Sequence, residues 1–283
     1  MTRSGPGWRP VSVKRALGGL VKAAAAGVDT VKRSSPGIVV LIYHRVGAGS
    51  GLEIDLPAPL FEHQMELLAE RYRVVSLEVA LAALAAPAPH PTEPLVVVTF
   101  DDGTVDFVDV AVPILERLRI PATLYVTTSF VEEQRAFPND GTPVSWSGLA
   151  DACSTGLIDV GSHTHRHRLL DRIAANEVDD ELDRSIELIA ERLGREARHF
   201  AYPKALGGSA HAEQAVRSRF RSAALAGTRS NRYGATDPFR LARSPVQRSD
   251  GLAWFARKAG GGMALEDSLR RVANRRRYAS STM

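Results

Sequence analysis

The chain has a single cysteine, Cys153, among its 283 residues. An intramolecular disulfide is therefore excluded. Long apolar runs are also missing, since no stretch approaches the roughly 20 apolar residues that a membrane-spanning helix needs. Aromatic residues make up 6% of the chain and the net charge is only +4, so neither aromatic interleaving nor strong positive charge favours nucleic-acid binding.

The N-terminal residues carry basic side chains but no apolar core of the kind found in a signal peptide. Apolar residues recur there at helical spacing, from Val13 to Val31, with lysines and arginines on the remaining face. We expect residues 1–36 to form a basic helical extension that packs on a domain at residues 37–283. The alternative is peripheral association of this helix with an anionic membrane surface. We expect a location in the cytoplasm or at the membrane periphery, and the sequence leaves export open.

Strand-like and helix-like segments alternate along the rest of the chain, which indicates a parallel sheet with helices outside it. The expected strands lie at residues 38–44, 72–77, 95–100, 122–131, 157–163, 199–203, 221–227 and 239–246. The expected helices lie at residues 60–72, 77–86, 104–119, 145–156, 174–194 and 209–220, followed by two more near the C-terminus. This order predicts an α/β fold, a single distorted (β/α) barrel of TIM type with seven strands.

Titratable side chains gather where the expected strands end, which is where barrels of this type carry their chemistry. The first strand ends at His44, the strand LVVVTF is followed by Asp101 and Asp102, and a later strand ends at His163. A late strand carries Arg243. The sequence therefore predicts one functional site at the carboxyl ends of the strands.

Three histidines alternate in the segment GSHTHRH, residues 161–167. In an extended strand His163 and His167 would lie about 13 Å apart, too far to share one ion. In a helical turn, residues four apart lie on one face about 6 Å apart, and such histidines form a familiar metal-binding pair. We expect this pair to bind a metal with a nearby carboxylate, while His165 points elsewhere. Zn²⁺ is the expected ion, although Co²⁺, Ni²⁺, Mn²⁺ and Fe²⁺ suit the same ligands.

The motif TFDDG, followed about sixty residues later by H-T-x-x-H, resembles the polysaccharide deacetylase family, the NodB-homology group. The segments LIYHRV, DVGSHTHRH and FAYP support the resemblance, and together the motifs span residues 38–246. The resemblance implies a distorted barrel and a hydrolase that removes acetyl groups, usually the N-acetyl group of a hexosamine in a polysaccharide. An N-acetylated glycan is the partner that this reaction implies.

The same resemblance implies a role for individual residues. The implied metal ligands are Asp102, His163 and His167. Asp101 corresponds to the catalytic base, which takes a proton from the attacking water. A backbone N–H beside Tyr202 and Pro203 corresponds to the donor that stabilises the oxyanion.

Two departures from the family pattern affect these assignments. Many members carry an arginine just before the proline of the third motif, where this chain has Ala201 and Tyr202, and Arg243 is the candidate substitute that orients Asp101. The usual C-terminal leucine–x–histidine motif is also absent, because no histidine follows His211. We expect His44 to act as the general acid, as in the branch with an N-terminal Tyr-His-Arg motif.

Two alternative functions remain open at the level of sequence. The same site could hydrolyse an O-acetylated or non-polymeric substrate, which a panel of substrates would distinguish. The missing arginine also leaves open a glycan-binding barrel with weak catalysis.

Overall fold

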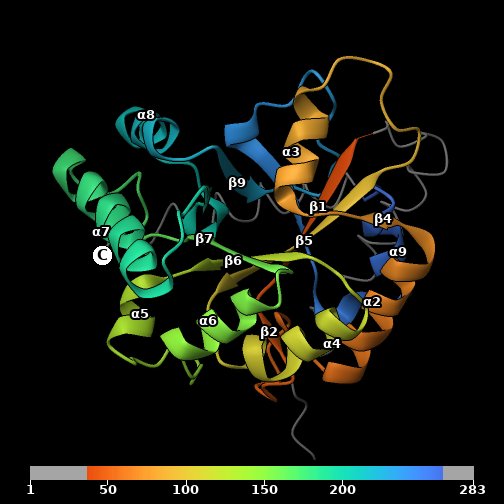
Figure 1. Ribbon diagram of the computed structural model, residues 1–283, viewed down its shortest axis with the longest axis horizontal. Helices are drawn as coiled ribbons and strands as arrows, with labels where there is room; N and C mark the ends of the chain where they lie inside the picture. Colours follow the sequence, from red (N-terminus) through yellow and green to blue (C-terminus); the bar gives the residue numbers. More distant parts are fainter. Residues whose placement is uncertain (1–36, 264–283) are drawn as a thin grey trace, which may run out of the picture.

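Seven parallel strands close into a barrel in the computed structural model, which describes residues 37–263 (Figure 1). Around the ring the order is β1, β10, β9, β8, β7, β6 and β5, and β5 pairs with β1 to close it. The strands are β1 (Ile38–Tyr43), β5 (Leu95–Asp102), β6 (Ala122–Val126), β7 (Ile158–Ser162), β8 (His199–Ala201), β9 (Ser222–Ala226) and β10 (Leu241–Pro245). The predicted seven-stranded barrel of TIM type is confirmed.

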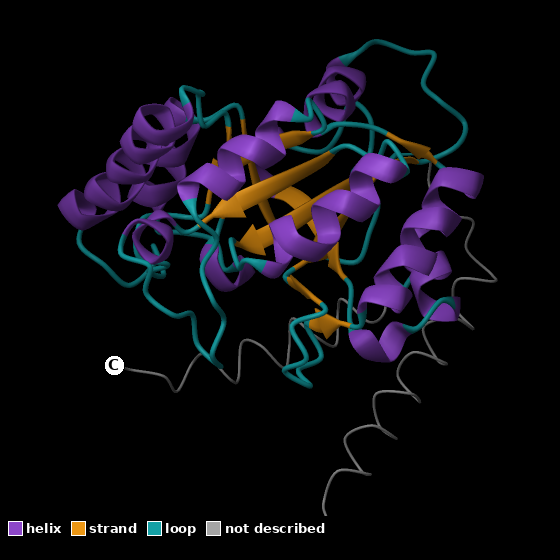
Figure 2. Ribbon diagram, turned by 60° about the horizontal axis from the view of Figure 1, so that its bottom comes forward, coloured by secondary structure: helices purple, strands orange, loops and turns teal. Residues whose placement is uncertain are grey.

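Helices surround the strands (Figure 2). They are α2 (Ala58–Arg71), α3 (Leu77–Ala85), α4 (Val112–Arg117), α5 (Thr128–Glu132), α6 (Trp146–Ser154), α7 (Ala175–Leu193), α8 (Ala210–Arg219) and α9 (Ala253–Ala259). Three short strands lie outside the ring. Strand β4 (Arg73–Val74) pairs with the start of β5, and β2 (Arg45–Val46) pairs with β3 (Asp55–Leu56). Short helical segments are the π-helix η1 (Phe107–Ala111) and the 3-10 helices η2 (Pro203–Ala205), η3 (Pro238–Arg240) and η4 (Arg248–Asp250). The predicted extension at residues 1–36 and the second C-terminal helix lie outside the described residues.

The longest helix, α7, shows how local sequence sets its ends. The N–H of Ala174 donates to the Glu177 carboxylate at 3.0 Å, which satisfies one of the unpaired donors of the first turn. Gly194 ends the helix in the left-handed region with φ 62°, where a residue without Cβ avoids strain. Between these ends, apolar side chains such as Val178 and Leu182 face the core.

Alternation along the strands separates two apolar clusters. One face of β1, with Val39 and Leu41, packs with the surrounding helices in the larger cluster. The other face, with Ile38 and Val40, belongs to a smaller cluster formed with residues of the neighbouring strands. Helix α3 contributes Leu77, Ala80 and Leu84 to this inner cluster. The interior of the barrel is therefore filled by side chains, and α3 closes the end at which the strands begin.

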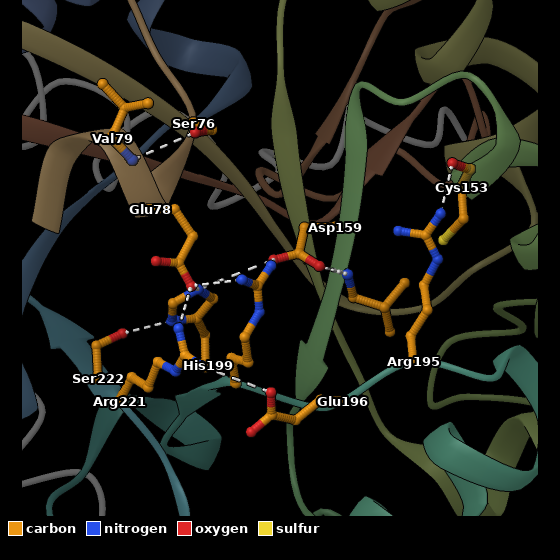
Figure 3. A network of polar contacts seen from close by, with 12 residues as sticks. Ser76, Glu78, Val79, Cys153, Asp159, Arg195, Glu196, His199, Arg221 and Ser222 are labelled. Atoms are coloured by element: carbon orange, nitrogen blue, oxygen red, sulfur yellow. Dashed lines mark hydrogen bonds and ion pairs between the residues drawn. The ribbon is translucent and has the colours of Figure 1, made fainter. Parts of the chain in front are cut away.

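A polar network covers the same end of the barrel (Figure 3). Glu78 of α3 forms an ion pair with Arg198 at 3.0 Å, and its carboxylate lies 3.2 Å from the Nε2 atom of His199. His199 is fully buried, and its Nδ1 atom forms a hydrogen bond with the Ser222 hydroxyl at 3.0 Å. Arg198 also reaches Asp159 at the start of β7, at 3.3 Å. These contacts fix α3 to three strands and leave the opposite end for chemistry.

One predicted strand is too long. The strand expected at residues 122–131 ends at Val126, and the next residues form α5. The N–H groups of Thr128 and Ser129 donate to the carbonyls of Thr164 and His165, at 3.4 and 2.8 Å. These bonds to a distant segment override the strand preference of β-branched residues.

No helix between residues 37 and 263 combines the length and apolar character needed to cross a membrane.

Candidate functional site

Most of the predicted site residues lie at the carboxyl ends of the strands, and Arg243 comes from the middle of β10. His44 follows β1 directly after Tyr43, which is aligned with Phe100 in β5. The carboxylates of Asp101 and Asp102 end β5, and His163 follows β7. Arg243 lies in β10 opposite Val40 of β1. The register of a closed parallel barrel therefore brings these side chains to one rim.

Asp102, His163 and His167 form a group that can bind one cation. Their ligand atoms all lie within 4.8 Å of one another. Asp102 Oδ1 lies 3.7 Å from Nε2 of His163 and 3.6 Å from Nε2 of His167. Metal–ligand bonds of about 2.0–2.2 Å can be met from one point among atoms at this separation. The donor set of two imidazoles and one carboxylate fits a divalent transition metal.

Hydrogen bonding and burial favour the form of the histidines that binds metals. The Nδ1 atom of His163 lies 2.7 Å from the carbonyl oxygen of Ala201, so this nitrogen carries the proton and donates it. The lone pair of Nε2 then faces Asp102, the usual arrangement around a protein metal. Burial, followed by the nearby charge of His163, lowers the pKa of His167 to about 4. The His167 imidazole is therefore available as a neutral ligand at pH 7.

The backbone at these candidate ligands is not regular. Asp102 has φ 76°, and Thr164 and His167 have φ 67° and 59°, in the left-handed region. The helical turn predicted for residues 163–167 is therefore wrong, because an irregular segment brings the two imidazoles together with ring centroids 4.9 Å apart. Such strain is retained where surrounding contacts fix it, often at functional sites.

His165 points away from this group, as predicted. It is buried, and its Nδ1 atom lies 3.0 Å from the Thr128 hydroxyl in α5.

Asp101 and Arg243 form a buried pair beside the cation site. Arg243 Nη1 and Nη2 donate to the two oxygens of Asp101 at 2.6 and 2.9 Å, and the arginine is fully buried. The same Nη1 also reaches the Thr99 hydroxyl at 3.2 Å, and the guanidinium lies over the Tyr125 ring at 5.0 Å. Burial is the largest single influence and raises the pKa of Asp101, but the charge and hydrogen bonds of Arg243 together with the nearby His163 and His44 outweigh it, and the pKa falls to about 2. Asp101 is therefore ionised and held in one orientation.

Replacing Arg243 with Gln is expected to lower the free energy of unfolding by about 3–5 kcal/mol, because the variant leaves a buried carboxylate without its cation. Chemical denaturation monitored by circular dichroism measures this loss. The control is Arg217→Gln, which removes an ion pair with Asp237 whose two side chains are 43% and 35% exposed. An exposed pair contributes about 0–1 kcal/mol. Equal losses in the two variants would contradict the importance of the buried pair.

His44 lies beside the same carboxylate. Its side chain is partly buried, and its charge would lower the pKa of Asp101, although burial and Arg243 act on that group more strongly. No described residue forms a hydrogen bond with the His44 ring. The imidazole is therefore free to exchange a proton with a bound molecule.

The backbone nitrogens of Tyr202 and Pro203 themselves are not free to donate. The N–H of Tyr202 donates to the carbonyl of Ala224 at 3.1 Å, and proline has no N–H. The Tyr202 ring is 3% exposed and packs edge-on against Phe200 at 4.9 Å. Pairing of β8 with β9 thus uses the N–H of Tyr202 itself, and the expected donor beside these two residues stays a prediction.

The sequence interpretation missed Arg45 and Asp106, which lie just outside the assigned residues. The Asp106 carboxylate accepts a hydrogen bond from the N–H of Val46 at 2.6 Å, and Arg45 is buried directly after His44. Their positions in the sequence could have indicated that they lie near the site. Arg45 belongs to the LIYHRV segment, and Asp106 follows TFDDG by three residues.

Comparison with known proteins supports this reading of the fold. Residues 88–221 match the family model "Polysaccharide deacetylase". A Bacillus subtilis protein named "Putative polysaccharide deacetylase YxkH" is 23% identical over 175 residues, which cover 61% of this chain and 59% of that protein. The match thus spans less than two thirds of that relative's length.

Two solved structures share the barrel. IcaB from Ammonifex degensii is 26% identical, with a TM-score of 0.69 over 78% of this chain and 98% of the other. The deacetylase PplD of Streptococcus pyogenes, solved in complex with acetate, is 22% identical, with a TM-score of 0.68 over 80% and 99% of the two chains. Residues 88–221 therefore resemble the polysaccharide deacetylase family, and the two solved structures share the fold of the barrel.

Proposed function

We propose that this protein is a metal-dependent hydrolase that removes acetyl groups from N-acetylated sugars of a glycan. The observation that carries the proposal is the Asp102–His163–His167 group directly beside the buried Asp101–Arg243 pair. A cation site next to an ionised carboxylate that does not itself ligate is the arrangement needed to activate water beside a carbonyl.

Asp102, His163 and His167 would hold the divalent ion, with Zn²⁺ as the expected occupant and Co²⁺, Ni²⁺, Mn²⁺ or Fe²⁺ suited to the same ligands. When bound, the ion would supply Lewis acidity, which polarises a carbonyl and lowers the pKa of water. The remaining chemistry belongs to residues of the chain.

Asp101 takes one proton from the water molecule that attacks the acetyl carbon. Arg243 keeps the Asp101 carboxylate oriented through its two hydrogen bonds. As the carbon–nitrogen bond breaks, His44 gives a proton to the departing nitrogen, so the sugar leaves as an amine and the acetyl group as acetate. The reaction consumes one water molecule and no other reactant, and general acid–base catalysis of this kind contributes about 10²–10⁴-fold to a rate.

The proposal predicts acetate release from N-acetylglucosamine oligomers by the metal-loaded protein and none after treatment with a chelator. Acetate measured by NMR, before and after Zn²⁺ is returned, provides the test. An O-acetylated sugar and a small acetamide in the same assay distinguish the alternatives. Acetate from the O-acetylated sugar alone would shift the substrate class to esters, and no acetate from any of them would contradict the proposal.

A further inference from the structure

Arg45 is a buried arginine next to the proposed general acid. It is 5% exposed and directly follows His44 in the chain. Its Nη1 atom donates to the carbonyl of Asn139 at 2.9 Å, and Nη2 donates to the carbonyl of Pro138 at 2.8 Å. Among the described residues no carboxylate forms an ion pair with it. The charge of Arg45 acts on the nearby Asp106 carboxylate without a direct ion pair. Burying a charge without a direct ion pair is costly, so the two carbonyls are the groups that stabilise the guanidinium by contact.

Those carbonyls belong to a tight turn between α5 and α6. The N–H of Phe137 donates to the carbonyl of Gly141 at 2.7 Å. Asn139 and Asp140 both lie in the left-handed region, with φ 58° and 57°. Gly141 leaves the space that the guanidinium occupies, because a Cβ at this position would overlap with Arg45 Nη2. The turn is thus shaped around the arginine.

The residues after this turn support the segment that carries the two site carboxylates. The N–H of Val105 donates to the carbonyl of Thr142 at 2.8 Å, and the N–H of Val144 donates to the carbonyl of Gly103 at 3.0 Å. Gly103 immediately follows the metal-site residue Asp102. Residues 137–144 therefore link the Arg45 guanidinium to the backbone of the carboxylate segment.

A further hydrogen bond joins the segment around Arg45 directly to the segment that follows the two site carboxylates. The N–H of Val46, the residue after Arg45, donates to the buried Asp106 carboxylate at 2.6 Å. Residues 44–46, residues 101–106 and residues 137–144 are thereby joined pairwise by hydrogen bonds. The backbone around His44 is held against the backbone around Asp101 and Asp102 from two directions.

We propose that Arg45 is a positioning residue that keeps His44 at the distance from the Asp101–Asp102 segment needed for proton donation. The inference rests on the proposed function, in which His44 protonates the departing nitrogen. A misplacement of about 1 Å at such a group can cost about 10²-fold in rate. Lysine cannot replace the arginine, because a single ammonium group does not reproduce the planar fork that spans two carbonyls.

The test compares two substrates that differ in their need for an acid. The amine of an N-acetylglucosamine oligomer must be protonated to leave, whereas the nitrophenolate of 4-nitrophenyl acetate leaves without a proton. Arg45→Lys is expected to lower kcat about 10²-fold on the oligomer and to leave kcat on the ester unchanged. His44→Ala is expected to show the same selective loss. Equal losses on both substrates, or no loss on either, would overturn the proposal.

A second variant disrupts the contact between Arg45 and the turn by changing the turn instead of the arginine. Gly141→Ala removes no atom of Arg45 but occupies the place of its guanidinium. It is expected to reproduce the selective loss, and the double variant is expected to lose no more than either single one, since both break one contact. A multiplicative loss in the double variant would show that the two residues act separately.

Arg195→Lys provides the matched control. Arg195 also donates to a backbone carbonyl, that of Cys153 at 3.1 Å, but it takes no part in the three segments around the site (Figure 3). The kcat of the Arg195→Lys variant on both substrates should equal that of the wild-type protein.

Hydrogen exchange separates this proposal from the proposed function. The amides of Val105 and Val144 should exchange faster in Arg45→Lys and Gly141→Ala than in wild type or Arg195→Lys. Unchanged exchange would overturn the role of Arg45 even in an active enzyme. Absence of acetate from the wild-type protein would instead contradict the proposed function, while the exchange rates still decide whether Arg45 joins the segments.

Discussion

Asp101→Asn is expected to lower the rate of acetate release by about 10²–10⁴-fold, the usual contribution of a general base, while the protein still binds one equivalent of divalent metal. An amide cannot take the proton from water. The proposed metal site is left intact, because its three ligands would be Asp102, His163 and His167. Acetate release by NMR and metal content by mass spectrometry of the same sample measure the two effects.

A carboxylate at the opposite end of the barrel provides the control for this substitution. Asp159 lies at the start of β7 and pairs with Arg198 at 3.3 Å. Asp159→Asn should leave acetate release unchanged, although it also removes one negative charge from the barrel. Full activity in Asp101→Asn would show that another group takes the proton.

Asp102→Ala is expected to abolish both metal binding and acetate release. The carboxylate lies within 3.7 Å of both histidine nitrogens and is the only acidic member of the group in residues 37–263. Its side chain is 24% exposed, and none of the described residues donates a hydrogen bond to it. Folding therefore depends little on this carboxylate, and loss of metal can be measured in a folded protein.

The backbone at this position requires a second variant. Asp102 has φ 76°, which alanine tolerates less well than aspartate or asparagine. Asp102→Asn keeps the backbone preference and removes the anionic ligand, so it should bind metal much more weakly with little change in thermal stability. A full equivalent of metal retained by both variants would disprove the ligand assignment.

The barrel and the convergence of its strand ends could be predicted because both follow from repeating patterns. Continuous apolar strands separated by amphipathic helices specify a parallel barrel, and the rim is where its loops meet. His44, Asp101 and His163 end different strands, so their proximity required no knowledge of side-chain contacts. Arg243 was identified by the same rule, and the structure places it on Asp101.

Contacts made through the backbone could not be predicted. The N–H of Tyr202 is used by the carbonyl of Ala224, and α5 begins where Thr128 and Ser129 bond to residues after β7. Arg45 binds two carbonyls, and every residue carries a carbonyl, so the sequence holds no signal for the acceptor. Only the three-dimensional arrangement distinguishes these partners.

The packing of α3 against one end of the barrel determines from which end small molecules reach the candidate site. Because Leu77, Ala80 and Leu84 fill the end where the strands begin, nothing can pass through the interior. Asp102 and His167, with side chains 24% and 23% exposed, lie at the other end and meet solvent. In the proposed function, water, sugar and product would therefore share one route, and a long glycan would lie across the rim instead of threading through the barrel.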